Sequence, residues 1–310
     1  MFAHEAGSGT PIVLLHGFGL DHRSLLPLEP TFESAGGWRR IYLDLPGATG
    51  TPADGITSTQ QVADAAAEEI RARLGDEPFA VLGNSFGGMI ARYVAHELRP
   101  QVLGLATVAG VFVARHDQRA VPERTVLVTE PGIESILGHS LEQYREDAVV
   151  ESTDAAHAFL QHLLPGIEGA DPEALDRIAQ AYSLDQEPED QHPEPFLQST
   201  LHLTGRQDDV VGYADAWHRV EHYPRATFAT LDAAGHNIMF EQPELCSALI
   251  TEWLARVRRG ALAPQSNGAA RPRRIPPTTP TTTLKMTKAI PPNPVANRDP
   301  ATITTQRIAP

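Results

Sequence analysis

The stretch FAVLGNSFGGMI, residues 79–90, contains the pattern that decides the fold. Its first residues form an apolar run typical of a buried strand, and residues 86–98 carry apolar side chains at the spacing of one helix face. Between them, Gly83-Asn84-Ser85-Phe86-Gly87 matches G-x-S-x-G in a strand–turn–helix context, where a serine on a tight turn exposes its hydroxyl. We therefore predict that Ser85 is a nucleophile and not a serine of an ordinary glycine-rich turn.

A serine hydroxyl needs a general base, and the base needs a third group that fixes its tautomer. In proteins whose nucleophilic serine lies on such a strand–turn–helix segment, the three residues follow one another along the chain in the order serine, acid, histidine. The sequence GRQDD, residues 205–209, follows an apolar strand-like run, and Gly235-His236 follows the next such run. We predict His236 as the base and Asp208 as its orienting acid, with Asp209 as the alternative acid and Asp232 as a more remote one.

Twelve other histidines compete for the role of base. His16 lies in a turn after a strand, His96 in the helix after Ser85, and His157 and His162 in a helical insertion, so we expect these four to be structural or solvated. His236 alone combines a flanking glycine with a loop after the last predicted strand.

An oxyanion formed at the substrate carbonyl also needs donors. The first amides of the helix after Ser85 point toward that space, and a second donor is expected from the loop His16-Gly17-Phe18-Gly19. We predict the backbone N–H groups of Phe18 and Phe86 as the oxyanion hole, with the Phe18 side chain lining the acyl pocket. Asn84 is expected to serve the turn and not the chemistry.

Outward from this segment, strand-like and helix-like segments alternate, which indicates a mostly parallel sheet covered by helices on both faces. An Ala- and Glu-rich helix is predicted over 59–74, and a short helix over 213–222 between the last two strands. A late helix is predicted over 244–256. The predicted strands are Ile12–Leu15, Ile41–Leu43, Phe79–Leu82, Val102–Val108, Thr200–Leu203 and Ala226–Leu231.

Residues 113–197 break this alternation and are predicted to form a helical cap inserted between two parts of a catalytic domain, 1–112 and 198–258. The insertion contains eighteen Asp/Glu and five Arg, a net charge of −13. Its predicted features are an apolar stripe over 156–164, a capping box from Ser140 to Gln143, and an N-cap at Asp171 followed by proline.

Residues 259–310 are predicted to be a disordered tail. Residues 261–310 contain ten prolines and nine threonines but no aromatic residue, and such a segment buries too little apolar surface to offset its ordering entropy. This segment has seven Lys/Arg and one Asp, so the remaining 260 residues carry a net charge of −20.

Composition limits the class of protein. A net charge of −14 argues against nucleic-acid binding. The single cysteine, Cys246, cannot form an internal disulfide, and no apolar run is long enough to span a membrane. We expect a cytoplasmic protein that acts on a small molecule, with no membrane partner. The sequence does not indicate an oligomeric state.

No cofactor or metal is predicted. Gly17-Phe18-Gly19 lacks the third glycine of a dinucleotide fingerprint, and no Walker motif is present. The segment His218-Arg-Val-Glu221-His222 matches the zinc pattern H-x-x-E-H, but it coincides with the predicted helix between the last two strands and has no evident third ligand.

The motifs LLHGFG, LDLPG, GNSFGG, GRQDD and AGHN, in this order, resemble the α/β-hydrolase superfamily over about residues 1–258. GNSFGG is similar to the elbow of meta-cleavage-product hydrolases and of esterases with helical lids. The resemblance implies a sheet of up to eight strands and a mobile cap over the site. Two features depart from it: only one strand fits before residue 12, and the Pro/Thr-rich tail is foreign to the superfamily.

Hydrolysis of a carboxylic ester or related acyl substrate, through an acyl-enzyme, is the leading interpretation. Carbon–carbon hydrolysis of a dienoate is the alternative, although a cap with a net charge of −13 repels anions. A prolyl-type aminopeptidase ranks third, since the HGGPG loop and the tryptophan after the serine that mark that group are missing. The non-enzyme alternative is a catalytically silent receptor with a hydrolase fold.

Overall fold

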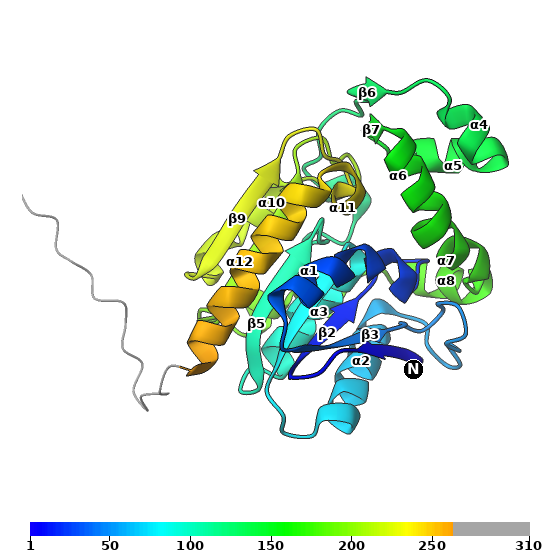
Figure 1. Ribbon diagram of the computed structural model, residues 1–310. Coiled ribbons are helices and arrows are strands. Elements are labelled where there is room, and N and C mark those ends of the chain that lie inside the picture. The colour runs from blue at the N-terminus through cyan, green and yellow to red at the C-terminus, as the bar shows by residue number, and fades with distance from the viewer. Residues whose placement is uncertain (263–310) are drawn as a thin grey trace, which may run out of the picture. The chain divides into compact units, whose positions relative to one another are not determined.

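A seven-stranded sheet runs through the computed structural model of this chain, which describes residues 1–262 (Figure 1). The strand order is β1-β3-β2-β4-β5-β8-β9, and each neighbouring pair is parallel except β1 with β3. The sheet therefore has the mostly parallel α/β form predicted from the sequence. The strands are β1 (Ala3–Ala6), β2 (Thr10–Leu15), β3 (Trp38–Leu43), β4 (Phe79–Asn84), β5 (Val102–Val108), β8 (Ser199–Gly205) and β9 (Ala226–Leu231).

The strands form where continuous apolar runs can be buried on both faces of a parallel sheet. Every residue of β4 and of β8 is buried. The strand β3 begins three residues earlier than predicted because Arg39 and Arg40 hide the apolar pattern. Arg40 is nevertheless buried, and its guanidinium pairs with Glu29 and donates to the Trp38 carbonyl.

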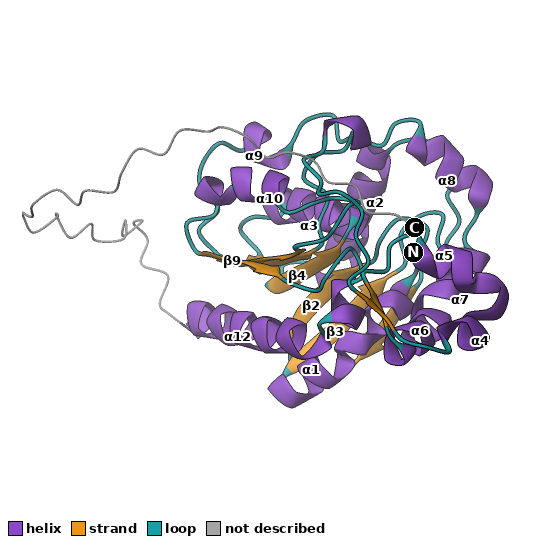
Figure 2. Ribbon diagram, turned by 90° about the horizontal axis from the view of Figure 1, so that it is seen from above, coloured by secondary structure: helices purple, strands orange, loops and turns teal. Residues whose placement is uncertain are grey.

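Helices cover both faces of the sheet (Figure 2). The helices α1 and α12 pack together on one face, and α2 and α3 pack together on the other. The helix α2 spans the predicted residues, and α3 ends one residue earlier than predicted. The predicted helix 213–222 is a short α-helix followed by a 3-10 turn. The helices are α1 (Glu29–Ala35), α2 (Thr59–Leu74), α3 (Phe86–Glu97), α10 (Ala214–His218), α11 (Ile238–Glu241) and α12 (Pro243–Leu262).

The insertion 113–197 contains short helices and a two-stranded parallel sheet, set apart from the main sheet in Figure 1. The predicted stripe 156–164 lies over α6, a π-helical turn and α7, and its side chains form a small core of the insertion's own. Its elements are β6 (Val128–Thr129), α4 (Ile133–Leu137), α5 (Leu141–Arg145), β7 (Val150–Glu151), α6 (Thr153–Ala158), the π-helical turn Phe159–Leu163, α7 (Leu164–Gly169), α8 (Pro172–Ala179) and α9 (Pro188–Gln191).

Two predicted caps have different outcomes. Asp171 caps α8, with its carboxylate accepting from the Ala174 amide at 3.1 Å and Pro172 in the first turn. The capping box at Ser140 was a wrong prediction. Ser140 already belongs to a 3-10 turn that continues from α4 into α5, and its hydroxyl accepts no capping hydrogen bond.

Residues 259–262 of the predicted tail are helical, because α12 continues through them. The rest of that prediction lies outside the described residues. Within residues 1–262, no helix is both long and apolar enough to cross a membrane.

Candidate active site

Ser85 lies at the turn between β4 and α3 in a strained backbone conformation, with φ 53° and ψ −118°. Only a few per cent of residues other than glycine have positive φ, and they persist where surrounding contacts hold them. Here the Ser85 amide donates to the Val108 carbonyl at 3.0 Å. The Ser85 carbonyl accepts from the Gly88 and Val111 amides at 2.9 and 3.0 Å. The neighbouring strand and the first helical turn thus fix the serine backbone.

Two glycines make this turn sterically feasible. A Cβ on Gly83 would lie 2.0 Å from the Gly87 carbonyl oxygen, and a Cβ on Gly87 would lie 2.1 Å from the Leu15 carbonyl oxygen. Both contacts are to backbone atoms that cannot move aside. The glycines of the motif are therefore required by the close approach of β4, α3 and the end of β2.

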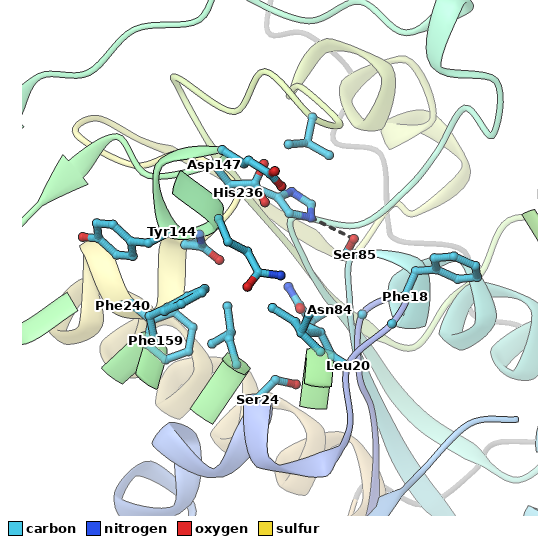
Figure 3. A pocket seen from close by; sticks show the side chains of 18 of the residues that line it. Phe18, Leu20, Ser24, Asn84, Ser85, Tyr144, Asp147, Phe159, His236 and Phe240 are labelled. Carbon is cyan, nitrogen blue, oxygen red and sulfur yellow. Dashed lines mark hydrogen bonds between the residues drawn. The ribbon is translucent and has the colours of Figure 1, made fainter. Parts of the chain in front are cut away.

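Three of the predicted residues come together from separate loops. Ser85 Oγ lies 2.8 Å from His236 Nε2, the contact drawn as a dashed line in Figure 3. His236 Nδ1 lies 3.1 Å from Asp208 Oδ2. His236 follows β9, and Asp208 follows β8. The other Asp208 oxygen accepts from the Val210 and Val211 amides at 3.0 and 2.9 Å. These bonds fix the carboxylate, which is fully buried.

The electrostatics of the site make His236 a stronger base than a free imidazole. Burial lowers the pKa of His236, but the neighbouring carboxylates, with Asp208 the largest contributor, together outweigh burial, so the pKa is raised above its ordinary value of 6.5. Asp147, from the insertion, acts in the same direction. Asp208 therefore orients the imidazole, and it contributes more to the basicity of His236 than Asp147 does.

The alternative acids lie elsewhere. The nearest cation to Asp209 is Arg124, at 3.6 Å, and burial raises the pKa of Asp209. Asp232 accepts from the Gln207 side chain at 2.8 Å. Of the three aspartates, Asp208 is the one in contact with His236.

Two of the competing histidines have clear structural bonds. His16 Nε2 accepts from the Leu45 amide at 2.9 Å, which joins the loops after β2 and β3, and burial lowers the pKa of His16. His96 Nε2 lies 2.9 Å from Nε2 of His222, the last residue of the H-x-x-E-H segment. Residues 1–262 hold no group of three or more His, Cys, Asp or Glu side chains arranged to bind a metal.

The two residues predicted to supply the oxyanion donors lie near the site, since Phe86 follows Ser85 in the chain and Phe18 lines the same cavity as Ser85. Phe86 is the first residue of α3, so its amide has no carbonyl partner within the helix. The rings of Phe18 and Phe86 meet edge to face, with centroids 5.2 Å apart. The ring of Tyr182, from the insertion, packs against both, and its centroid lies 5.3 Å from each of theirs. This aromatic cluster packs the Phe18 side chain against α3 and the insertion. Asn84 donates to the Val108 carbonyl at 3.0 Å, as expected for a residue of the turn.

A cavity of about 390 Å³ opens above Ser85, between the sheet edge and the insertion (Figure 3). Most of its lining side chains are aromatic or aliphatic, Phe18 among them. None of the described residues that line it is Lys or Arg, and two are acidic, Glu146 and Asp147. The insertion contributes Gln143, Tyr144, Glu146, Asp147, Phe159, Leu163, Ile167, Leu175 and Tyr182.

No sequence pattern marked these insertion residues as part of the site. The apolar stripe pointed to Phe159 and Leu163 as buried, but burial alone does not tell a cavity wall from a packed core. Gln143 and Asp147 gave no signal, since isolated polar residues in an acidic segment usually face solvent.

Comparison with known proteins agrees with this architecture. A family model described as the alpha/beta hydrolase family matches residues 12–249. An alpha/beta superfamily hydrolase from Oenococcus oeni PSU-1 is 26% identical with a TM-score of 0.77, over 83% of this chain and 96% of that one. None of the curated proteins matches the sequence.

Two esterase structures share the fold. A thermophilic esterase from Thermogutta terrifontis is 23% identical with a TM-score of 0.58, over 83% of this chain and 93% of that one. An esterase from Exiguobacterium antarcticum is 19% identical with a TM-score of 0.62, over 82% and 95%. At these identities the similarity establishes the fold alone.

Proposed function

The chain belongs to the alpha/beta hydrolase family, and on this premise we propose that it is a serine hydrolase that cleaves a small, uncharged carboxylic ester. One observation carries the proposal. Ser85 Oγ, His236 and the buried Asp208 form a continuous hydrogen-bonded chain, of which Ser85 and His236 line a cavity. Such a chain is what a serine needs in order to attack an acyl carbon.

The reaction proceeds in two halves. Ser85 Oγ attacks the ester carbonyl while His236 Nε2 accepts its proton, and the Phe18 and Phe86 amides receive the oxyanion. Protonated His236 then gives this proton to the departing alcohol, which leaves an acyl-enzyme. In the second half a water molecule attacks the acyl carbon, His236 accepts the water proton and returns it to Ser85, and the carboxylic acid departs.

The charge of the cavity supports a neutral substrate. A dienoate substrate of carbon–carbon hydrolysis is an anion and needs a cationic partner, yet no Lys or Arg is among the described residues that line the cavity. Glu146 and Asp147 would repel such a substrate. The same two carboxylates make an acyl group with a free amine the second candidate.

A panel of p-nitrophenyl esters of graded acyl length tests the proposal, run beside a dienoate and an amino-acyl p-nitroanilide. We expect short and medium acyl esters to be turned over and long ones poorly, because a cavity of about 390 Å³ limits the acyl chain. Ser85→Ala is the matched control. Turnover of the dienoate alone would replace ester hydrolysis with carbon–carbon hydrolysis.

A further inference from the structure

Glu241, the last residue of α11, is a buried carboxylate outside the chain of residues that performs the proposed reaction. Its Oε2 accepts a hydrogen bond at 2.6 Å from the amide of Gly235, the residue directly before His236. Its Oε1 accepts from the Val149 and Val150 amides, at 2.6 and 3.1 Å. One side chain thus joins the loop that carries His236 to the insertion 113–197, which we call the cap.

The two segments that Glu241 joins also touch each other. A Cβ on Gly235 would lie 2.5 Å from Val149 Cγ2 and 3.3 Å from the Asp147 carbonyl oxygen. The cap segment 147–150 therefore lies directly on the His236 loop. This segment carries Asp147, which lines the cavity and raises the pKa of His236.

Two other side chains hold the same loop without reaching the cap. Gln207 accepts from the Ala234 amide at 3.2 Å, and Gln242 donates to the Ala233 carbonyl at 3.2 Å. Within residues 1–262, neither glutamine has a hydrogen bond to the insertion 113–197. Glu241 alone of these three residues links the loop to the cap.

The burial of a carboxylate at this point calls for an explanation. All of the hydrogen bonds to Glu241 in the described chain come from backbone amides, and burial raises its pKa despite them. A buried carboxyl without a cation costs free energy that an apolar side chain would not. An apolar side chain, however, could not accept from amides of both segments.

We propose that Glu241 is a positioning residue that couples docking of the cap segment 147–150 to the alignment of His236 against Ser85. The inference rests on the proposed function, because it assigns His236 the role of general base. Movement of the cap away from the sheet would remove two of the three amides that hold the Glu241 carboxylate. The carboxylate would then be free to leave the Gly235 amide, and the loop would lose its hold on His236.

Glu241→Gln tests the coupling. It preserves the shape of the side chain but replaces one acceptor oxygen with an NH₂ group that faces an amide donor. We expect Ser85 to react with a fluorophosphonate about 10- to 100-fold more slowly, the cost of a small misplacement in an active site. The kcat for a short ester should fall by the same factor with less change in KM. Backbone amide exchange at residues 149–150 and 235–236 should become faster.

Two controls separate coupling from simple support of the loop. Gln242→Ala weakens the loop but leaves the cap bonds, so amide exchange at residues 149–150 should stay at the wild-type rate. Glu244→Gln removes a carboxylate from an exposed side chain three residues away and should change neither labelling nor exchange.

The coupling is wrong if Glu241→Gln labels at the wild-type rate, or if Gln242→Ala speeds exchange at residues 149–150 as much as Glu241→Gln does.

If Glu241→Gln does not fold, Gly235→Ala tests the same contact, since its Cβ would push Val149 away while Glu241 remains. The coupling is supported if the wild-type chain is labelled and the Gly235→Ala chain is not. It is overturned if the Gly235→Ala chain is labelled at the wild-type rate. A wild-type chain that fails to label would remove the proposed function instead, and exchange at residues 149–150 would still test the link.

Discussion

The sheet edge that carries Ser85, Asp208 and His236 and the cap that faces it border one cavity but are built differently. Ser85 and Asp208 follow the fully buried strands β4 and β8, His236 follows the half-buried strand β9, and backbone hydrogen bonds hold the turn at Ser85. The cap consists of short helices around a small core of its own, with exposed apolar residues at 126–128 and a net charge of −13. We infer that the rigid edge determines the reaction and that the cap determines which substrates reach it.

The largest expected effect is at the edge. Asp208→Asn should lower kcat by about 10⁴-fold for every ester tested, because the amide no longer stabilises the imidazolium or the correct tautomer. Asp209→Asn is the matched control and should cost little, since Asp209 does not contact His236. Steady-state kinetics on several esters measure both. A larger loss in Asp209→Asn would move the role of the acid to the neighbouring residue.

A change of charge in the cap should alter selectivity more than chemistry. Asp147→Lys places a cation at the cavity wall, so the ratio of kcat/KM for an anionic ester to that for a neutral ester should rise about 10-fold. Glu142→Lys makes the same change of charge on an exposed cap residue that does not line the cavity. An equal rise in the control would mean that net charge, and not the cavity wall, selects the substrate.

The pH profile connects the two regions. His236 must be neutral to accept the proton, and its pKa is raised above 6.5, so kcat/KM should fall as the pH decreases through a midpoint above 6.5. Asp147 contributes to this rise, so Asp147→Asn should move the acidic limb to lower pH. A limb that does not move would show that the cap has no electrostatic influence on the base.

The smallest effect is expected outside both regions. A chain that ends at Leu262 retains every residue of the candidate site and of the cap. Its melting temperature and its turnover of a short ester should match those of the full chain. Loss of soluble protein or of activity would give residues 263–310 a role that neither region accounts for.

The difference between the two regions also explains how far the sequence could be interpreted. The apolar runs predicted the sheet. The order serine, acid, histidine predicted that Ser85, Asp208 and His236 lie together, because the carboxyl ends of parallel strands meet at one edge of a sheet. The geometry of the turn at Ser85 requires Gly83 and Gly87, so a short sequence pattern was enough to predict this turn.

The cap side of the site could not be predicted in the same way. Whether Gln143 or Asp147 faces the cavity depends on how short helices pack on the sheet, which leaves no periodic signal in the sequence. Glu241 gave no signal either, because its partners are backbone amides that every residue possesses. The false capping box at Ser140 shows the same limit, since a short pattern does not reveal that the preceding turn is already helical.

The most direct test of the central claim is active-site labelling with a fluorophosphonate, followed by mass spectrometry of the modified peptide. The wild-type chain should be modified at Ser85, at a rate that follows the deprotonation of His236, and Ser85→Ala should not be labelled. Absence of labelling in a folded wild-type chain, or equal labelling of Ser85→Ala, would contradict the account and favour a catalytically silent hydrolase fold.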